Sequence, residues 1–280
     1  MDTKALIADG RYVRVARPAD IRDELAQIRK IDHRQERRTK LCKFVAIASG
    51  IGGLLAMLAA GPIGLVGIVL AAVFGYLAWR GSRLDIPDGR YETLVKLSKL
   101  LGADLPPQGT LDVVMDLRRS DEKAHLDSEF EKDRWKVKLY INPCLRVSGR
   151  LADGNKFWVV VTERQEERSR VARTRSGKSK LKRKTKGSLK FDVTVRPDVE
   201  RYGQVSTLDK FLKEAAKVPA PMSLVQAEAS DTELRLRAAG PGHPGLPVYS
   251  SAAETVAMLL LSAYQCLNFQ AENLRGQRGA

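Results

Sequence analysis

The most distinctive pattern in the chain is an uncharged apolar run of 36 residues between Lys43 and Arg80. One helix needs only about 20 residues to cross a hydrocarbon core of about 30 Å, so this run is too long for a single untilted span. Gly61 and Pro62 lie near its midpoint, where proline removes a backbone donor and glycine permits a turn. The pattern therefore predicts a hairpin of two membrane helices, residues 44–60 and 63–79, with the membrane turn at Gly61 and Pro62.

Basic residues flank the apolar run on both sides, whereas its turn carries no charge. Lysines and arginines near membrane helices favour the cytoplasmic side. We therefore expect an integral membrane protein with both termini in the cytoplasm. The flanking residues are Arg37, Arg38, Lys40 and Lys43 before the run, and Arg80 and Arg83 after it.

Small residues recur at four-residue spacing within the apolar run, and in lipid such faces allow helix backbones to approach closely. Two interpretations remain open at this point. The small faces either pack the two helices of the hairpin together, or they also join protomers into a homo-oligomer. The residues assigned to membrane helix packing are Gly50, Gly53, Gly67, Ala71 and Gly75.

The residues before the apolar run form a basic N-terminal segment, 1–43, with one amphipathic helix. Pro18 to Asp20 provide a helix start, and an apolar stripe follows at Ile21, Leu25, Ile28 and Ile31. The stripe contains no Trp or Phe, so packing on the soluble domain or on a partner helix is favoured over lying along an anionic leaflet.

Residues 80–280 show the alternation that is typical of half-buried strands. Strands are predicted around residues 111–117, 135–147, 157–161 and 189–195, with two shorter ones within 223–239 that turn at Ser230 and Asp231. Helices are predicted at 91–101, at 207–217 and after Ser251, the last one covering the sheet. The order indicates an antiparallel meander rather than strand–helix–strand units.

The fold class is therefore α+β: a two-helix transmembrane hairpin plus a cytoplasmic domain of antiparallel β-strands with covering helices. A long basic β-hairpin or loop completes it. Residues 163–190 contain 12 Lys or Arg against three Glu, a local charge of +9 out of +15 for the whole chain. With almost no apolar alternation, this segment is either a projecting two-stranded ribbon or a flexible loop.

So much local positive charge predicts an anionic partner. Lipid headgroups come first because an anchor lies in the same chain, and an acidic protein surface is the next option. Residues 121–133, with six carboxylates, could supply that surface from a neighbouring protomer. Nucleic acid is disfavoured because this segment has no aromatic side chain for base stacking. A solvated loop without a dedicated partner is the remaining alternative. The assigned residues are Arg164, Arg168, Arg170, Arg173, Arg175, Lys178, Lys180, Lys182, Arg183, Lys184 and Lys186.

The composition limits the remaining options. With 44% hydrophobic residues in 280, the chain is long and apolar enough for a core, which argues against wholesale disorder. Its three cysteines and three histidines are scattered, without CxxC or zinc-ligand spacing, so we expect reduced thiols and no metal. No catalytic or cofactor-binding motif occurs, which favours a protein that is not an enzyme.

These patterns together predict a non-enzymatic membrane scaffold or adaptor. It would self-associate through its membrane hairpin and display a basic cytoplasmic domain. Two alternatives stay open: a membrane tether for nucleic acid or for a particle containing it, and a pore-forming effector. The second is weakened because neither apolar helix has a polar stripe to line a lumen.

Overall fold

The computed structural model describes residues 10–60, 62–82, 88–173, 179–240, 243–244, 249 and 251–278. The chain divides into two units, one made of residues 1–22 and 88–280 and the other of residues 23–87. The first unit is α+β and contains the sheet. In the second, the described residues are helical apart from the turn residue Pro62. Among the described residues, two helices are long and apolar enough to cross a membrane.

Within the described residues, nine strands form one antiparallel sheet in the order β1-β2-β4-β5-β6-β8-β7, with β3 added beside β4 and β9 beside β6. The predicted antiparallel pairing is confirmed, but β6 pairs with β8 rather than β7, so the last strands depart from a simple meander. The strands are β1 (Arg11–Ala16), β2 (Leu111–Asp116), β3 (Leu126–Lys132), β4 (Trp135–Arg150), β5 (Lys156–Arg173), β6 (Ser179–Arg196), β7 (Ser223–Ala229), β8 (Leu234–Ala239) and β9 (His243–Pro244).

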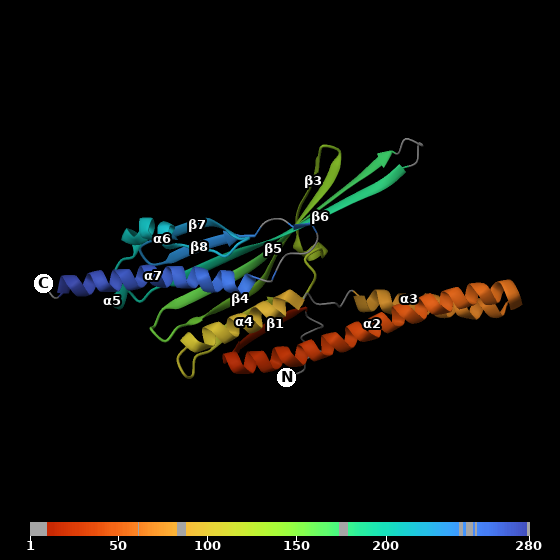
Figure 1. Cartoon of the computed structure of the whole chain (residues 1–280), viewed down its shortest axis with the longest axis horizontal. Coiled ribbons are helices and arrows are strands. Elements are labelled where there is room, and N and C mark those ends of the chain that lie inside the picture. Colours follow the sequence, from red (N-terminus) through yellow and green to blue (C-terminus); the bar gives the residue numbers. More distant parts are fainter. Residues whose placement is uncertain are drawn as a thin grey trace. The chain divides into compact units, whose positions relative to one another are not determined.

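The core lies on one face of this sheet, against helices α4 (Asp88–Asp104) and α7 (Ala252–Arg278) (Figure 1). Alternate residues of each strand point to this face, as the period of two requires. Phe157, Val159 and Val161 of β5 are completely buried. Opposite them on β6 lie Phe191, Val193 and Val195, also completely buried. Helix α7 therefore covers the sheet, as its apolar face predicts.

Short helical elements connect β6 to β7. They are α5 (Val199–Tyr202), η2 (Ser206–Leu208) and α6 (Asp209–Ala215), so the helix predicted at 207–217 begins with a 3₁₀ turn. A further 3₁₀ turn, η1 (Lys123–His125), precedes β3. The Asp198 side chain accepts a hydrogen bond from the backbone N–H of Glu200, which caps α5. The elements between β6 and β7 lie at the end of the sheet away from the projecting ends of β5 and β6 (Figure 1).

Strand β1 is an element that the sequence analysis missed. Tyr12 is completely buried in the first unit, whereas Val13 and Val15 are exposed. The strand pairs along its whole length with β2. The basic N-terminal segment therefore contributes an edge strand to the sheet in addition to the predicted helix.

Helices α2 (Pro18–Ala60) and α3 (Ile63–Ser82) contain the apolar run. The predicted amphipathic helix and the first predicted membrane helix are one continuous helix, since no helix-breaking residue separates them at Lys43. The predicted boundary at residue 43 therefore marks a change in composition within α2. The carbonyl of Pro62 accepts the backbone N–H of Leu65 at 3.1 Å at the start of α3, while Gly61 lies outside the described residues.

Candidate functional site

The basic segment is a two-stranded ribbon in the residues that the structure describes. Strands β5 and β6 pair continuously from Lys156↔Arg196 to Arg173↔Ser179. Strand β4 accompanies β5 only as far as the Lys136↔Ser169 pair. Beyond that pair, β5 and β6 continue without β4 and project from the sheet (Figure 1).

The strand register sorts the predicted anion-binding residues by face. Arg164, Arg168 and Arg170 lie opposite Ser188, Lys184 and Lys182 on β6, and Glu166 and Ala172 lie opposite Lys186 and Lys180. All these residues share the face that points away from α4 and α7. We call the following set the basic face: Arg164, Arg168, Arg170, Lys180, Lys182, Lys184 and Lys186.

The other predicted cations do not belong to this face. Arg183 and the backbone position of Arg173 fall on the opposite side of the ribbon by register. Arg175 and Lys178 lie outside the described residues. Glu166, which forms an ion pair with Arg168, is the carboxylate that the register places on the ribbon's basic face between residues 164 and 172. The basic face therefore keeps most of its positive charge.

A tryptophan from another strand completes the surface. The Arg170 guanidinium lies over the Trp135 ring, 4.4 Å from its centroid, and the Lys184 ammonium lies 5.6 Å from the same centroid. Cations over an indole face are attracted by its negative quadrupole. Sequence analysis missed this contact because Trp135 belongs to β4, far from the basic segment in sequence. The strand alternation around Trp135 was the available signal.

Apolar side chains accompany these cations. Val137 of β4 lies in register between Phe130 of β3 and Arg168 of β5, and it is 2% exposed. Phe130 and Ile141 are 44% and 39% exposed. The aliphatic stems of Arg and Lys commonly cover apolar surface while their charged ends reach water. The basic face thus combines an apolar base with a cationic rim.

A buried ion pair lies at the point where the core ends and the basic ribbon begins. Arg90 of α4 donates from Nε and Nη2 to Oε1 and Oε2 of Glu163 at 2.6 and 2.7 Å. Arg90 also donates to the carbonyls of Asp116 and Arg118 and to the Ser120 hydroxyl. Burial lowers the pKa of Arg90, but the hydrogen bonds and charge of Glu163 outweigh it, and the net pKa is raised.

The pKa values of two titratable side chains beside this pair, Asp116 and His125, are both lowered. Burial raises the pKa of Asp116, but its bonds from Arg118 at 2.6 to 3.0 Å overcome this and lower it. Burial lowers the pKa of His125, and Asp116 at 3.7 Å only partly opposes that change. His125 is therefore held neutral beside an ionised carboxylate. The start of α4 is joined to β2 by the Arg90 hydrogen bond to the Asp116 carbonyl.

The buried cysteine in this region is not a reactive thiol. Cys144 donates to the carbonyl of Val161 at 3.3 Å, and burial raises the pKa of its thiol well above the usual value. Nucleophilic cysteines need the opposite shift. In the described part of the chain, no group of three His, Cys, Asp or Glu side chains is arranged to hold a metal ion.

The acidic segment predicted as a partner surface is partly engaged within its own domain. Residues 126–132 of it form β3, which pairs with β4. Asp121 accepts from Arg119 at 2.9 Å, and Glu129 lies 3.5 Å from the Lys138 ammonium. These two carboxylates lie beside cations of their own domain, which reduces their availability to a second protomer.

In the helical unit, glycines mark where α2 and α3 come into contact. A Cβ atom added at Gly53 would lie 2.9 Å from backbone atoms of Gly64 and Gly67, and one added at Gly67 would lie 2.6 Å from the Gly53 Cα. A Cβ atom added at Gly50 would lie 3.6 Å from the Ala71 Cβ, an ordinary contact distance. Four of the five predicted packing residues therefore lie at this contact.

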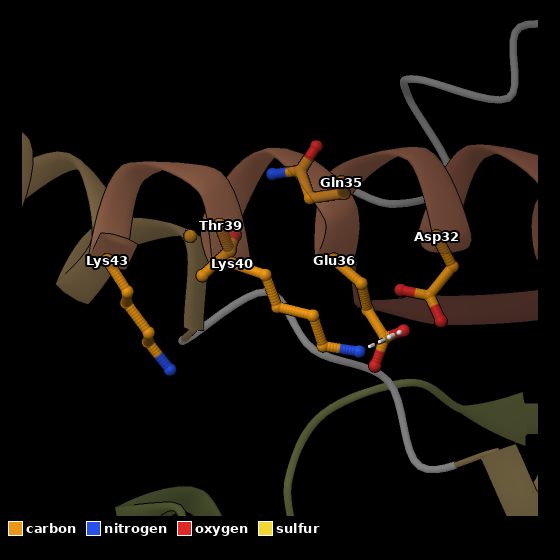
Figure 2. Close-up of a pocket in the computed structure, with 7 residues that line it drawn as sticks. Asp32, Gln35, Glu36, Thr39, Lys40 and Lys43 are labelled. Carbon is orange, nitrogen blue, oxygen red and sulfur yellow. Dashed lines mark hydrogen bonds and ion pairs between the residues drawn. The ribbon is translucent and has the colours of Figure 1, made fainter. Parts of the chain in front are cut away.

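Gly75 behaves differently, since nothing that the structure describes lies within 4 Å of a Cβ added there. A small hollow lies further toward the polar end of the same unit, lined by Asp32, Glu36, Lys40, Lys43 and Gly81. Figure 2 shows the Lys40 ammonium reaching toward the Glu36 carboxylate, at 3.4 Å. The hollow mixes both signs of charge and defines no single ligand.

No protein family model matches this chain, and searches of curated proteins and of solved structures likewise give no match.

Proposed function

We propose that this protein is a non-enzymatic integral membrane scaffold, anchored by a helical hairpin that consists of the apolar part of α2 and of α3. The carrying observation is the exposure of that hairpin. Only 6% and 11% of the apolar windows of the two helices are buried. Phe44, Ile47 and Leu58 are 71%, 64% and 83% exposed.

Water is an unfavourable solvent for such a surface. Transferring one Leu, Ile or Phe side chain out of water contributes roughly 1.5–3 kcal/mol, and many such side chains are exposed along both helices. The core helices of a soluble domain bury this surface within the fold, as α7 does with Val256, Leu259 and Leu267. Insertion into lipid is therefore the best-supported role for residues 44–79.

The distribution of charge supports a cytoplasmic location for both soluble parts. Lysines and arginines lie at the two polar ends of the hairpin, and its turn is uncharged. The sheet domain, with its basic face, would then be displayed in the cytoplasm. Such a domain without a metal cluster or reactive thiol in its described residues fits a binding module better than a catalyst.

Self-association is proposed through the part of the hairpin that its own packing leaves open. Gly53 and Gly67 are used between α2 and α3, whereas Gly75 has open space around it. In lipid, a small residue in such a position lets a second helix approach closely. A homo-oligomer would place several basic faces on one assembly.

Carbonate extraction of membranes followed by native mass measurement in detergent tests both parts. We expect the protein to stay in the membrane fraction and to have the mass of an oligomer, which Gly75→Leu reduces. Release into the soluble fraction would overturn the anchor. A monomeric mass for the unmodified protein would overturn self-association alone.

The two alternatives rest on narrower support. A nucleic-acid tether would find an aromatic group beside the basic face in Trp135, but the Arg170 guanidinium already lies over that ring. A pore-forming effector gains nothing from the apolar helices, which carry no charged residue between positions 44 and 79. Dye release from liposomes at high protein loading would be needed to revive it.

A further inference from the structure

The basic face has the chemistry of a surface that meets many anionic groups at once. We infer that it docks onto the anionic phospholipid headgroups of the leaflet that, in the proposed function, anchors the same chain. The inference deepens that function by naming the ligand class of the sheet domain. It rests on three observations: the side on which the charges lie, the apolar groups among them, and the position of Arg170 over the Trp135 ring.

Most of the described cations of the ribbon lie on one side of it. Arg164, Arg168 and Arg170 on β5 and the even-numbered lysines 180–186 on β6 share a face, and their neighbours in sequence point the other way. That opposite face is mixed, because Glu167 and Glu129 accompany Lys138 there. A flat, one-sided array of cations complements a planar anionic surface, which contacts one side of a ribbon at a time.

Apolar groups lie among these cations. Phe130, Trp135 and Ile141 share the open side of the sheet with the basic face, and Phe130 and Ile141 are more than a third exposed. Aromatic side chains with cations beside them suit the headgroup region, where one end of a side chain is apolar and the other is hydrated. A purely electrostatic contact would need no such residues.

The state of Trp135 argues against nucleic acid. Stacking of a base needs an accessible aromatic face. The Arg170 guanidinium already lies over the ring at 4.4 Å, and Lys184 is nearby at 5.6 Å. A base would have to displace Arg170, which would then lose its indole contact. A lipid phosphate would instead meet Arg170 and Lys184 where they are.

Two variants that remove charges from opposite faces test this inference. Both are made in the full-length chain, held in nanodiscs of neutral phosphatidylcholine. The probe is binding of vesicles, either of pure phosphatidylcholine or with about one third phosphatidylglycerol, a content that gives a negative surface potential. The variant Lys180→Gln/Lys182→Gln/Lys186→Gln removes three charges from the basic face. Its matched control, Lys136→Gln/Lys138→Gln/Arg183→Gln, removes three charges from the opposite face, two on β4 and one on β6.

Each cation at an anionic surface contributes roughly fivefold in affinity, so the basic-face variant should bind phosphatidylglycerol vesicles about a hundredfold more weakly. The control should change binding by less than about tenfold, and high salt should weaken the unmodified protein strongly. Equal losses in the two variants would overturn the inference, because net charge alone would then explain binding. Tighter binding of duplex DNA, RNA or a polyglutamate peptide than of the vesicles would also overturn it.

The proposed function fails in a different way from this inference. A chain that does not enter nanodiscs has no membrane anchor, whatever its basic face binds. If the chain enters nanodiscs but does not bind phosphatidylglycerol vesicles, the membrane anchor stands and the inferred headgroup binding is overturned.

Discussion

Strands β5 and β6 have two halves with the same backbone pairing and opposite chemistry. In one half, Val161 faces Phe191 inside the core, and both are completely buried. In the other half, Val171 faces Leu181, and they are 69% and 52% exposed. Hydrogen bonding continues through both halves, so the ladder does not depend on the covering helices. The comparison shows that the hydrophobic core stops at the Arg90–Glu163 ion pair, whereas strands β5 and β6 continue beyond it.

The largest expected effect comes from breaking that boundary. Arg90→Ala or Glu163→Ala leaves a buried charge without its partner, which typically costs about 3–5 kcal/mol. Denaturant unfolding of the detergent-solubilised protein should show this loss. Arg119→Ala, which removes an exposed arginine of the same region, should cost less than about 0.5 kcal/mol. If Glu163→Ala cost as little as Arg119→Ala, the junction would not hold the core in place.

Two leucines on one strand measure the difference between the halves directly. Leu189 and Leu181 lie on the same face of β6, but Leu189 is 2% exposed and Leu181 is 52% exposed. Leu189→Ala should destabilise the domain by about 2–4 kcal/mol. Leu181→Ala should have an effect within about 0.5 kcal/mol. Similar losses in denaturant unfolding would mean that the ribbon is packed against something in solution.

Adjacent glycines provide the equivalent comparison in the helical unit. Gly53→Leu places a side chain against the backbone of Gly64 and Gly67, and such overpacking costs about 1–3 kcal/mol. Gly52 has open space, so Gly52→Leu should leave thermal stability in detergent unchanged or slightly higher. Equal melting temperatures for the two variants would contradict the contact between α2 and α3.

The smallest effect concerns pH. Burial lowers the pKa of His125 in the folded chain. In the unfolded chain this histidine takes up a proton at the usual histidine pKa of about 6.5, whereas in the folded chain it does so only at lower pH. This contribution to stability is present above about pH 6.5 and is lost as pH falls toward the folded pKa. Thermal unfolding should therefore show a decline from about pH 7 to about pH 5.5 that His125→Asn reduces. Parallel curves for the two proteins would exclude His125 as its source.

Acidification further down should act on both proteins alike. The pKa of Asp116 and that of Asp192 are both lowered: burial raises them, but hydrogen bonds from neighbouring arginines outweigh it. Their contribution is present above the unfolded pKa of about 4 and is lost as pH falls through the lower folded values. The stability curves of the variant and of the unmodified protein should therefore run parallel in this range.

The α+β class, the antiparallel sheet and the two long apolar helices were predictable from local patterns. Alternation at residues 157–161 and 189–195 marks strands, because each side of a strand meets one environment. The uncharged run of residues 44–79 marks the two apolar helices, because its length and apolar character are both visible in the sequence itself. What these patterns share is that a single segment carries the whole signal.

The junction and the surface were not predictable in this way. Arg90 and Glu163 are far apart in sequence, and each looks like an ordinary surface charge until the fold pairs them. Trp135 reaches the basic residues only through the register between β4 and β5. Strand β1 was missed because its alternation is short and interrupted by arginines. Long-range pairing decides all three, and local pattern says nothing of it.

Strand periodicity gives the basic ribbon an unusual tolerance. Any of its lysines can be exchanged for arginine while the sidedness of the charge is kept, because position parity alone assigns each cation to a side. A single inserted or deleted residue near Gln165 would instead transfer every following cation of β5 to the other side of the sheet. Exchanges between lysine and arginine should therefore be tolerated in this segment. Insertions or deletions should be tolerated only when they add or remove an even number of residues.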